Sequence, residues 1–282
     1  MPESGTIITN PNFDATLQAM VSGGRDKLHV LTDFDHTLTK GFIDGKKVAS
    51  LVAILRENKM LSPDYPAKAH AVLDKYYPFT TDPTISQEEK KKKMYEWYYT
   101  HFKLIIASGF TRDHVKEAID IGQLELREGV AEALKKLHQT KVPVIIISSS
   151  GLGGEAIEYY LQKNNLMMDN MHVVSNVWIW DAAGKAAAIK EPIIFNMNKD
   201  EIVLESELFY PEIIGRPNVL LIGNAADDVG MLGGRFHHNV IKVGFLDDKV
   251  EEKLPSFKEN FDVVLLDNQD FSFINGLLAK LL

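Results

Sequence analysis

Three features of the sequence predict an α/β protein with a parallel sheet and an inserted helical domain. Short apolar, β-branched runs recur along the chain without clean alternation, as in strands that are covered on both faces. Segments with helical spacing lie between several of these runs, which is typical of βαβ units. One long stretch contains no convincing strand. We therefore predict a Rossmann-like core and a separate helical cap.

Six apolar runs are the predicted strands of the core. They are Leu28–Thr32, Val142–Ser148, His172–Val177, Asn218–Ile222, Val240–Val243 and Phe261–Leu266. Helical spacing between strands is seen at Val130, Ala133, Leu134 and Leu137, and again at Ile157, Tyr160 and Leu161. The alternation predicts a parallel sheet with helices on both sides.

The stretch from Val48 to Ile121 breaks this alternation and indicates helices. Ser86 to Glu89 has the S-x-x-E form of a capping box, which marks a helix start. The residues that follow carry an apolar and aromatic stripe at helical spacing, formed by Met94, Trp97, Tyr98, His101, Leu104 and Ile105. We therefore predict an α/β core of residues 1–47 and 122–282, and a helical cap of residues 48–121 inserted after the first core strand.

Composition and charge exclude several classes of protein. The 282 residues include 31 basic and 39 acidic side chains, a net charge of −8, which disfavours nucleic acid and anionic membranes as partners. The absence of cysteine excludes thiol nucleophiles, disulfides and cysteine-ligated metal centres. There is no apolar run of the ~18 residues that a membrane span needs, and no secretory signal is recognisable at the N-terminus. We expect a cytoplasmic monomer.

Two acids directly follow the first predicted strand, in the sequence Asp33-Phe34-Asp35. Sites of parallel sheets lie at the carboxyl ends of strands, where residues two apart face the same side. Asp33 can attack an electrophile as a carboxylate, and Asp35 can give and take a proton. A divalent cation would relieve the repulsion between them. The alternative is an ordinary strand-ending turn, since Asp favours turns.

Three further stretches combine with these acids. Ser148 to Gly154 joins hydroxyls and glycines to a predicted helix start, which suits an anion. Lys199 lies in a polar stretch, and Asn224 and Asp228 follow another predicted strand as candidate oxygen ligands of a cation. Each stretch taken alone is equally consistent with a polar turn or a solvated loop. Together they match phosphoryl transfer, in which a protein mainly positions groups and offsets charge.

The sequence resembles a known family of phosphatases. Its D-x-D-x-T signature is that of the haloacid dehalogenase superfamily, and the closer resemblance is to the cytosolic pyrimidine 5′-nucleotidases, the type III 5′-nucleotidase group. The supporting stretches are Thr32–Leu38, Met94–Trp97, Ser149–Gly153, Val173–Asn176, Phe195–Glu201, Gly223–Met231 and Val243–Val250. The resemblance covers nearly the whole chain from Leu28 onward.

The resemblance implies a role for each matching residue. Asp33 would form an aspartyl-phosphate, Asp35 would protonate the leaving oxygen and then activate water, and Lys199 would neutralise charge. The phosphate would be held by Ser149, Ser150 and Gly151. Mg²⁺ would be held by Asp33, the main-chain carbonyl at Asp35, Asn224 and Asp228. Glu96, in the M-x-E-W segment of the cap, would lie near the base of a nucleoside 5′-monophosphate substrate.

Two positions keep alternatives open. The family's last motif has an acid where this chain has Asn224, so one negative charge at the metal is lost and weaker metal binding is expected. Glu96 lies off the apolar stripe of its helix and faces either the crevice or solvent. The competing functions are a phosphatase of the same superfamily acting on another small phosphate ester, and a nucleotide-binding protein with weakened catalysis.

Overall fold

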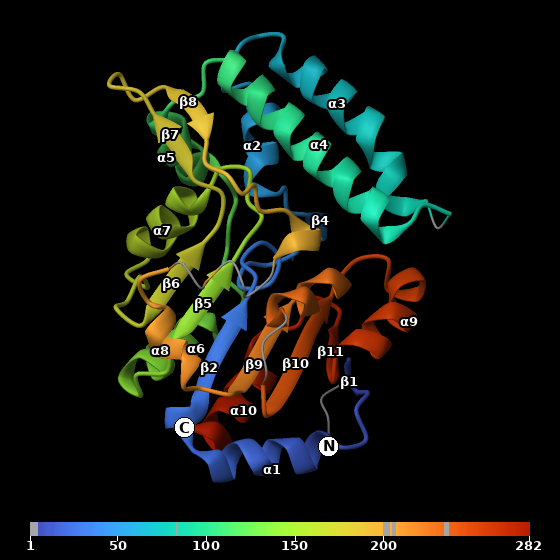
Figure 1. Cartoon of the computed structure of the whole chain (residues 1–282), viewed down its shortest axis with the longest axis vertical. Helices are drawn as coiled ribbons and strands as arrows, with labels where there is room; N and C mark the ends of the chain where they lie inside the picture. Colours follow the sequence, from blue (N-terminus) through green and yellow to red (C-terminus); the bar gives the residue numbers. More distant parts are fainter. Residues whose placement is uncertain (1–4, 83, 200–203, 205–206, 234–236) are drawn as a thin grey trace.

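The computed structural model describes residues 5–82, 84–199, 204, 207–233 and 237–282, and its centre is a seven-stranded sheet (Figure 1). The strand order is β1-β11-β10-β9-β2-β5-β6. The strands are β1 (Thr6–Ile8), β2 (Leu28–Thr32), β5 (Val144–Ile147), β6 (Met171–Val174), β9 (Asn218–Gly223), β10 (Asn239–Leu246) and β11 (Val263–Leu266). All neighbours pair in parallel except β1, which runs antiparallel to β11. The predicted fold class is confirmed.

The strand register brings three loops together at the middle of the sheet. Thr32, the last residue of β2, pairs with Ile222 of β9 and with Ile146 of β5. The three strands therefore end at the same level, and the loops that follow them begin side by side. These loops contain the first, second and last of the predicted site motifs.

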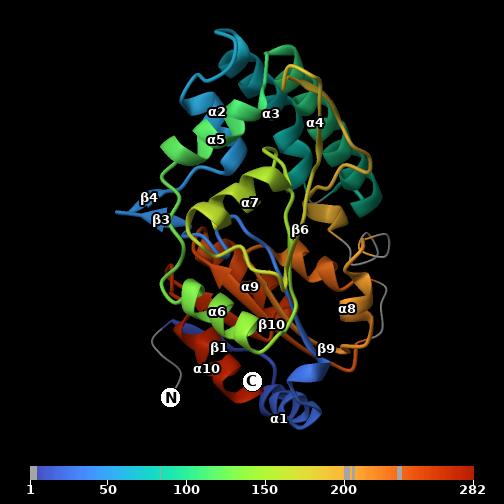
Figure 2. The same ribbon diagram turned by 90° about the vertical axis from the view of Figure 1, so that its left-hand side faces the viewer.

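Two apolar clusters cover the two faces of the sheet, because successive side chains of a strand point to opposite faces. Val30 of β2 joins the cluster with α1 (Phe13–Gly23), α6 (Val130–Gln139), α7 (Gly154–Lys163) and α10 (Ser272–Leu281). Leu31, the next residue, joins the cluster with α8 (Tyr210–Ile214) and α9 (Val250–Asn260). Figure 2 shows α6 and α7 on one side of the sheet and α8 on the other.

Four helices lie together beyond the carboxyl edge of the sheet and form what we call the cap: α2 (Leu51–Glu57), α3 (Tyr65–Thr81), α4 (Gln87–Ala107) and α5 (Arg112–Ile121) (Figure 1). The predicted helix start is confirmed, because the Ser86 hydroxyl accepts a hydrogen bond from the main-chain N–H of Glu89 at 3.2 Å. Division of the chain at residues 47/48 and 121/122 stays a prediction. In the described ranges, no helix has the length and apolar character needed to cross a membrane.

Two small hairpins were missed by the sequence patterns. One joins β3 (Phe42–Ile43) to β4 (Lys46–Lys47) before the cap. The other joins β7 (Trp178–Trp180) to β8 (Ala186–Ile189) and packs against the cap. The main-chain N–H of Ala186 donates to the carbonyl of Phe110, and that of Arg112 donates to the carbonyl of Gly184, both at 2.9 Å. The short helical turns are η1 (Arg25–Lys27), η2 (Asn196–Asn198) and η4 (Ala226–Leu232).

Candidate active site

The two acids of the first motif lie at the carboxyl end of β2. The main-chain N–H of Asp33 donates to the carbonyl of Ile222 at 3.1 Å, so the strand pairing continues up to the first acid. Phe34, between the acids, is fully buried in the core. This alternation turns Asp33 and Asp35 to the opposite side, where both line one cavity.

Lys199 joins two carboxylates in the interior. Its Nζ lies 2.6 Å from Oδ1 of Asp33 and 3.0 Å from Oδ1 of Asp228. All three side chains are buried, so the ion pairs are little screened by solvent. The loop before Lys199 is held by Asn198, whose amide oxygen accepts from Phe195 N at 2.6 Å. Asp200 and Glu201, at the end of the same predicted motif, lie outside the described residues.

The loop after β9 is folded around Asp228. Oδ2 of Asp228 accepts hydrogen bonds from the main-chain N–H groups of Asn224 and Ala225, at 2.9 and 3.0 Å. Gly223 permits this fold, because a Cβ at that position would lie 2.6 Å from Cβ of Asp228. The Thr37 hydroxyl lies 3.2 Å from Oδ1 of Asn224 and 3.4 Å from Oδ2 of Asp33. It has one proton and donates to one of them at a time.

The buried charges shift one another's pKa values. Burial raises the pKa of Asp33 to about 6, with Lys199 opposing the rise and Asp228 adding to it. Burial also raises the pKa of Asp35 to about 7, with a further contribution from the Asp33 carboxylate. Burial by itself lowers the pKa of Lys199, but Asp228 and Asp33 outweigh it and raise that pKa. Lys199 therefore stays charged, while Asp35 can hold a proton near neutral pH.

The serine loop after β5 forms the next wall of the cavity, to which Ser149, Ser150 and Gly151 all contribute. The Ser150 hydroxyl accepts from Leu152 N at 3.2 Å, which curls the loop ahead of α7. A Cβ at Gly151 would lie 2.7 Å from the Val52 side chain, so glycine is needed where the cap comes close. The arrangement suits an anion, since hydroxyls and main-chain N–H groups converge at a helix start.

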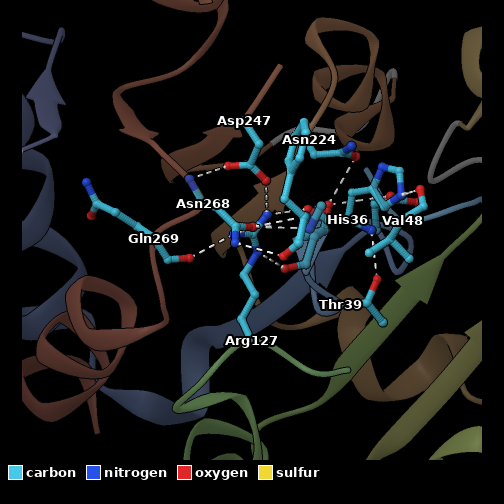
Figure 3. A network of polar contacts seen from close by, with 12 residues as sticks. His36, Thr39, Val48, Arg127, Asn224, Asp247, Asn268 and Gln269 are labelled. Carbon is cyan, nitrogen blue, oxygen red and sulfur yellow. Dashed lines mark hydrogen bonds and ion pairs between the residues drawn. The ribbon is translucent and has the colours of Figure 1, made fainter. Parts of the chain in front are cut away.

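A buried arginine that sequence reasoning missed holds the loop after Asp35 (Figure 3). Arg127 donates to the main-chain carbonyls of His36 and Thr37, at 2.6 and 3.0 Å, and to that of Gln269 at 2.8 Å. It also forms an ion pair with Asp247, and both side chains are buried. His36 has a φ of +59°, which is uncommon for a residue with a side chain. Arg127 therefore fixes a strained turn beside the acids.

The cavity has a volume of about 550 Å³ and lies between the sheet edge and the cap. The core supplies the acids, Lys199, Asn224, Asp228 and the serine loop. The cap supplies Arg56 from α2 and Trp97, Tyr98 and His101 from α4. The volume is in the range of small-molecule sites. The structure thus brings together every predicted site residue except one.

That exception is Glu96. Its carboxylate accepts a hydrogen bond from Nζ of Lys93 at 3.0 Å, and its side chain is 35% exposed. It is not among the residues that line the cavity, although Trp97 and Tyr98, which follow it on the helix, are. A contact between Glu96 and a base therefore stays a prediction.

The oxygen atoms near Asp33 fit a hard divalent cation. Oδ1 of Asp35 is buried and has no hydrogen-bond partner within the described part of the chain. Oδ2 of Asp33 and Oδ1 of Asn224 both lie near the Thr37 hydroxyl. Among the described residues no group of three or more His, Cys, Asp or Glu is placed to hold a metal. These oxygen atoms are therefore of the kind that a hard cation prefers, but the group carries few negative charges.

The fold and the site together define a phosphatase of the haloacid dehalogenase superfamily. The phosphoserine phosphatase structure titled "Phospho-Aspartyl Intermediate Analogue of Phosphoserine phosphatase" shares the fold, with a TM-score of 0.55, 19% identity and coverage of 89% of this chain and 97% of that one. The model of the family Pyrimidine 5′-nucleotidase (UMPH-1) matches residues 36–282. The chain belongs to this family, and the predicted resemblance is confirmed.

Individual relatives agree with this assignment. The chain is 30% identical over 267 residues to a chicken (Gallus gallus) protein named 7-methylguanosine phosphate-specific 5′-nucleotidase, covering 94% of this chain and 92% of the relative. It is also similar to the crystal structure of cytosolic 5′-nucleotidase IIIB bound to cytidine. The TM-score is 0.87 at 26% identity, with 99% of this chain and 94% of that chain covered. The prediction of a 5′-nucleotidase-class enzyme is confirmed.

Proposed function

We propose that this protein is a Mg²⁺-dependent phosphatase that converts nucleoside 5′-monophosphates to nucleosides and phosphate. The proposal rests on one observation, which is that Asp33, Asp35 and Lys199 line the same cavity. The serine loop lines this cavity from the core, and aromatic side chains of α4 line it from the cap. The phosphate of a nucleotide fits the first, and the base fits the second.

In the proposed reaction Asp33 acts as the nucleophile. One of its carboxylate oxygens attacks phosphorus, and the bond from phosphorus to the 5′ oxygen of the nucleoside breaks. Asp35, whose pKa is raised to about 7, gives its proton to the departing oxygen. Asp35 then accepts a proton from the water that attacks the aspartyl-phosphate, which releases phosphate and restores both acids. Lys199 holds Asp33 in place and offsets negative charge on the phosphoryl group.

Mg²⁺ would be held by Asp33, the main-chain carbonyl of Asp35 and Asn224. When bound, it would neutralise phosphate charge that the acids would otherwise repel. Asp228 is the fourth predicted ligand, but its oxygens already accept from Lys199 and from two main-chain N–H groups. Asp228 would therefore support the metal indirectly, by positioning the loop that carries Asn224.

A nucleoside monophosphate as substrate is supported by the family and by the structure bound to cytidine. We also infer a cytoplasmic location, which the word "cytosolic" in the name of that related enzyme supports. A monomeric state and the absence of a nucleic-acid partner stay predictions. The loss of an acid at Asn224 favours one competitor, a protein that binds nucleotides but turns them over poorly.

Phosphate release from a panel of nucleoside monophosphates, with Mg²⁺ at saturation, tests the proposal. Asp33→Asn should abolish release, because an amide of nearly the same shape is a poor nucleophile. Nucleotide binding, measured by calorimetry, should survive. Asp14→Asn removes an exposed acid on α1 and serves as the matched control. Turnover of Asp33→Asn within tenfold of the wild type would exclude the aspartyl-phosphate route, and binding without turnover in the wild type would establish the competitor.

A further inference from the structure

The cap end of the cavity carries an arginine that the proposed chemistry does not use. Arg56 lies near the C-terminal end of α2 and lines the cavity. Its side chain is 22% exposed, and the carboxylate found within ion-pair distance among the described residues is that of its neighbour Glu57. That pair is 3.9 Å apart and Glu57 is 55% exposed, so it stabilises little. Within the part of the chain that the structure describes, the guanidinium is left without a close counter-charge.

The position of Arg56 along α2 sets it apart from the phosphate end. At the start of the helix, the main-chain N–H of Leu51 lies close to the Asp35 carboxyl and opposes the rise of its pKa, and Val52 approaches Gly151 of the serine loop. Arg56 comes five residues after Leu51, which is about 7.5 Å further along the helix axis. A ligand whose phosphate lies at the serine loop would therefore extend its other end toward Arg56.

The groups beside Arg56 do not neutralise it. Nε2 of His101 lies 3.1 Å from the Tyr65 hydroxyl, and the two rings stack with centroids 6.2 Å apart. Burial lowers the pKa of His101 to about 4, and the nearby Arg56 contributes to the lowering. Burial raises the pKa of Tyr65 to about 12. Both neighbours are therefore uncharged near neutral pH, and this wall of the cavity is positive.

The remaining cap residues favour a ligand of a certain shape, and Arg56 is the residue that would recognise its polar groups. Trp97 lines the cavity with an aromatic ring, which suits a flat ligand, whereas Tyr98 lies close to Ser149 at the phosphate end. Glu96, the acid expected at this end, is held by Lys93 and does not line the cavity. The matching ligand is a planar ring that presents hydrogen-bond acceptors at the edge furthest from its phosphate.

We propose that Arg56 selects nucleotides with keto bases, meaning uracil or a 6-oxopurine such as guanine. This inference rests on the proposed nucleotidase function. A guanidinium donates well to the O4 of uracil or to the O6 and N7 of guanine. Cytosine and adenine present an amino group in place of this carbonyl, where donor would face donor, and adenine retains only its N7 as an acceptor at this edge. Guanine methylated at N7 carries a positive charge, which Arg56 would repel.

The test compares kcat/KM for UMP with CMP, and for GMP with AMP and N7-methyl-GMP. The wild type should favour the keto nucleotide of each pair about tenfold or more. Arg56→Gln should bring these ratios to within about threefold of unity, and Arg56→Lys should keep part of the preference because it retains the charge. Ratios within one protein do not depend on the fraction that is folded. Lys116→Gln, which removes an exposed cation on α5, is the matched control and should keep the wild-type ratios.

The outcomes that overturn the inference are distinct from failure of the proposed function. If the wild type hydrolyses nucleotides and the ratios are the same in Arg56→Gln, or if N7-methyl-GMP is preferred to GMP, Arg56 does not select the base. If Glu96→Gln shifts the ratios and Arg56→Gln does not, the acid is the selecting residue. A preference for fructose 1,6-bisphosphate over every nucleotide, lost in Arg56→Gln, would assign Arg56 to a second phosphate. If no nucleotide is hydrolysed, the proposed function fails first and the inference falls with it.

Discussion

Replacing Arg127 by methionine should destabilise the core and disturb the active-site loop together. Methionine can follow the path of the arginine stem, but it removes every donor. The carbonyls of His36, Thr37 and Gln269 each lose a hydrogen bond, and Oδ2 of Asp247 loses its ion pair. The side chains of Arg127 and Asp247 are 1% and 7% exposed, so water cannot replace these contacts without rearrangement.

The magnitude follows from the kind of contact that is lost. Breaking a buried ion pair by removing one partner costs about 3–5 kcal/mol. Each buried carbonyl left without a donor adds about 1 kcal/mol or more. Part of the added cost is recovered when the loop relaxes, so we expect the free energy of unfolding to fall by about 4 kcal/mol. That is a large part of the 5–15 kcal/mol that is typical of a domain.

Urea unfolding of three variants provides the assay. Arg127→Met should show the full loss. Arg127→Met combined with Asp247→Asn should recover about 2 kcal/mol, because the uncompensated charge is gone. Arg25→Met, which removes an exposed arginine, should change stability by less than about 0.5 kcal/mol. A loss below about 1 kcal/mol in Arg127→Met would refute the reasoning, and so would a double variant less stable than the single one.

Two other perturbations test the metal site and the cap. Asn224→Asp should lower the Mg²⁺ concentration needed for half-maximal activity, since charge count tunes affinity for hard cations. The gain should be modest, because Oδ2 of Asp228 lies 2.9 Å from the main-chain nitrogen of Asn224 and repulsion partly offsets a new carboxylate beside it. An unchanged or higher requirement in a Mg²⁺ titration would show that the lost charge is compensated elsewhere. The lowered pKa of His101 means that the folded protein holds this ring neutral, so its contribution to stability is present above pH 6.5 and is lost as the pH falls toward 4. Between pH 7 and pH 4.5 the free energy of unfolding should therefore fall in both proteins, but by about 2 kcal/mol less in His101→Asn than in the wild type. Parallel pH profiles of the two proteins would contradict this.

The sequence predicts the central strands of this protein better than its short peripheral strands. Each predicted core strand coincides with an observed strand, because buried parallel strands are continuous apolar runs. β1 has three residues and gives no such run. In β8 the residues are mostly alanine, which carries little strand signal, and its pairing with β7 depends on the cap behind it.

The site shows the same division. The two acids, Asn224 and the serines follow strands directly, so their convergence could be predicted from the topology alone. Arg127 could not be found in this way, because its partners come from segments about 90, 120 and 140 residues away. Arg56 lies in an ordinary helical pattern, and its role depends on which side of α2 faces the cavity. Helical spacing likewise leaves Glu96 with two possible surroundings.

The hairpin of β7 and β8 attaches the cap to a segment that follows it in the chain. Its turn and second strand are hydrogen-bonded to Phe110 and Arg112, at the junction of α4 and α5. The Trp178 ring packs against Phe102 and Phe110 of the same region, with centroids 5.2 and 5.0 Å apart. A cap that lifted away alone would have to break these contacts. Any displacement of the cap would therefore have to carry the hairpin with it, and the amide hydrogens of Ala186 and Arg112 should then exchange with solvent at matched rates.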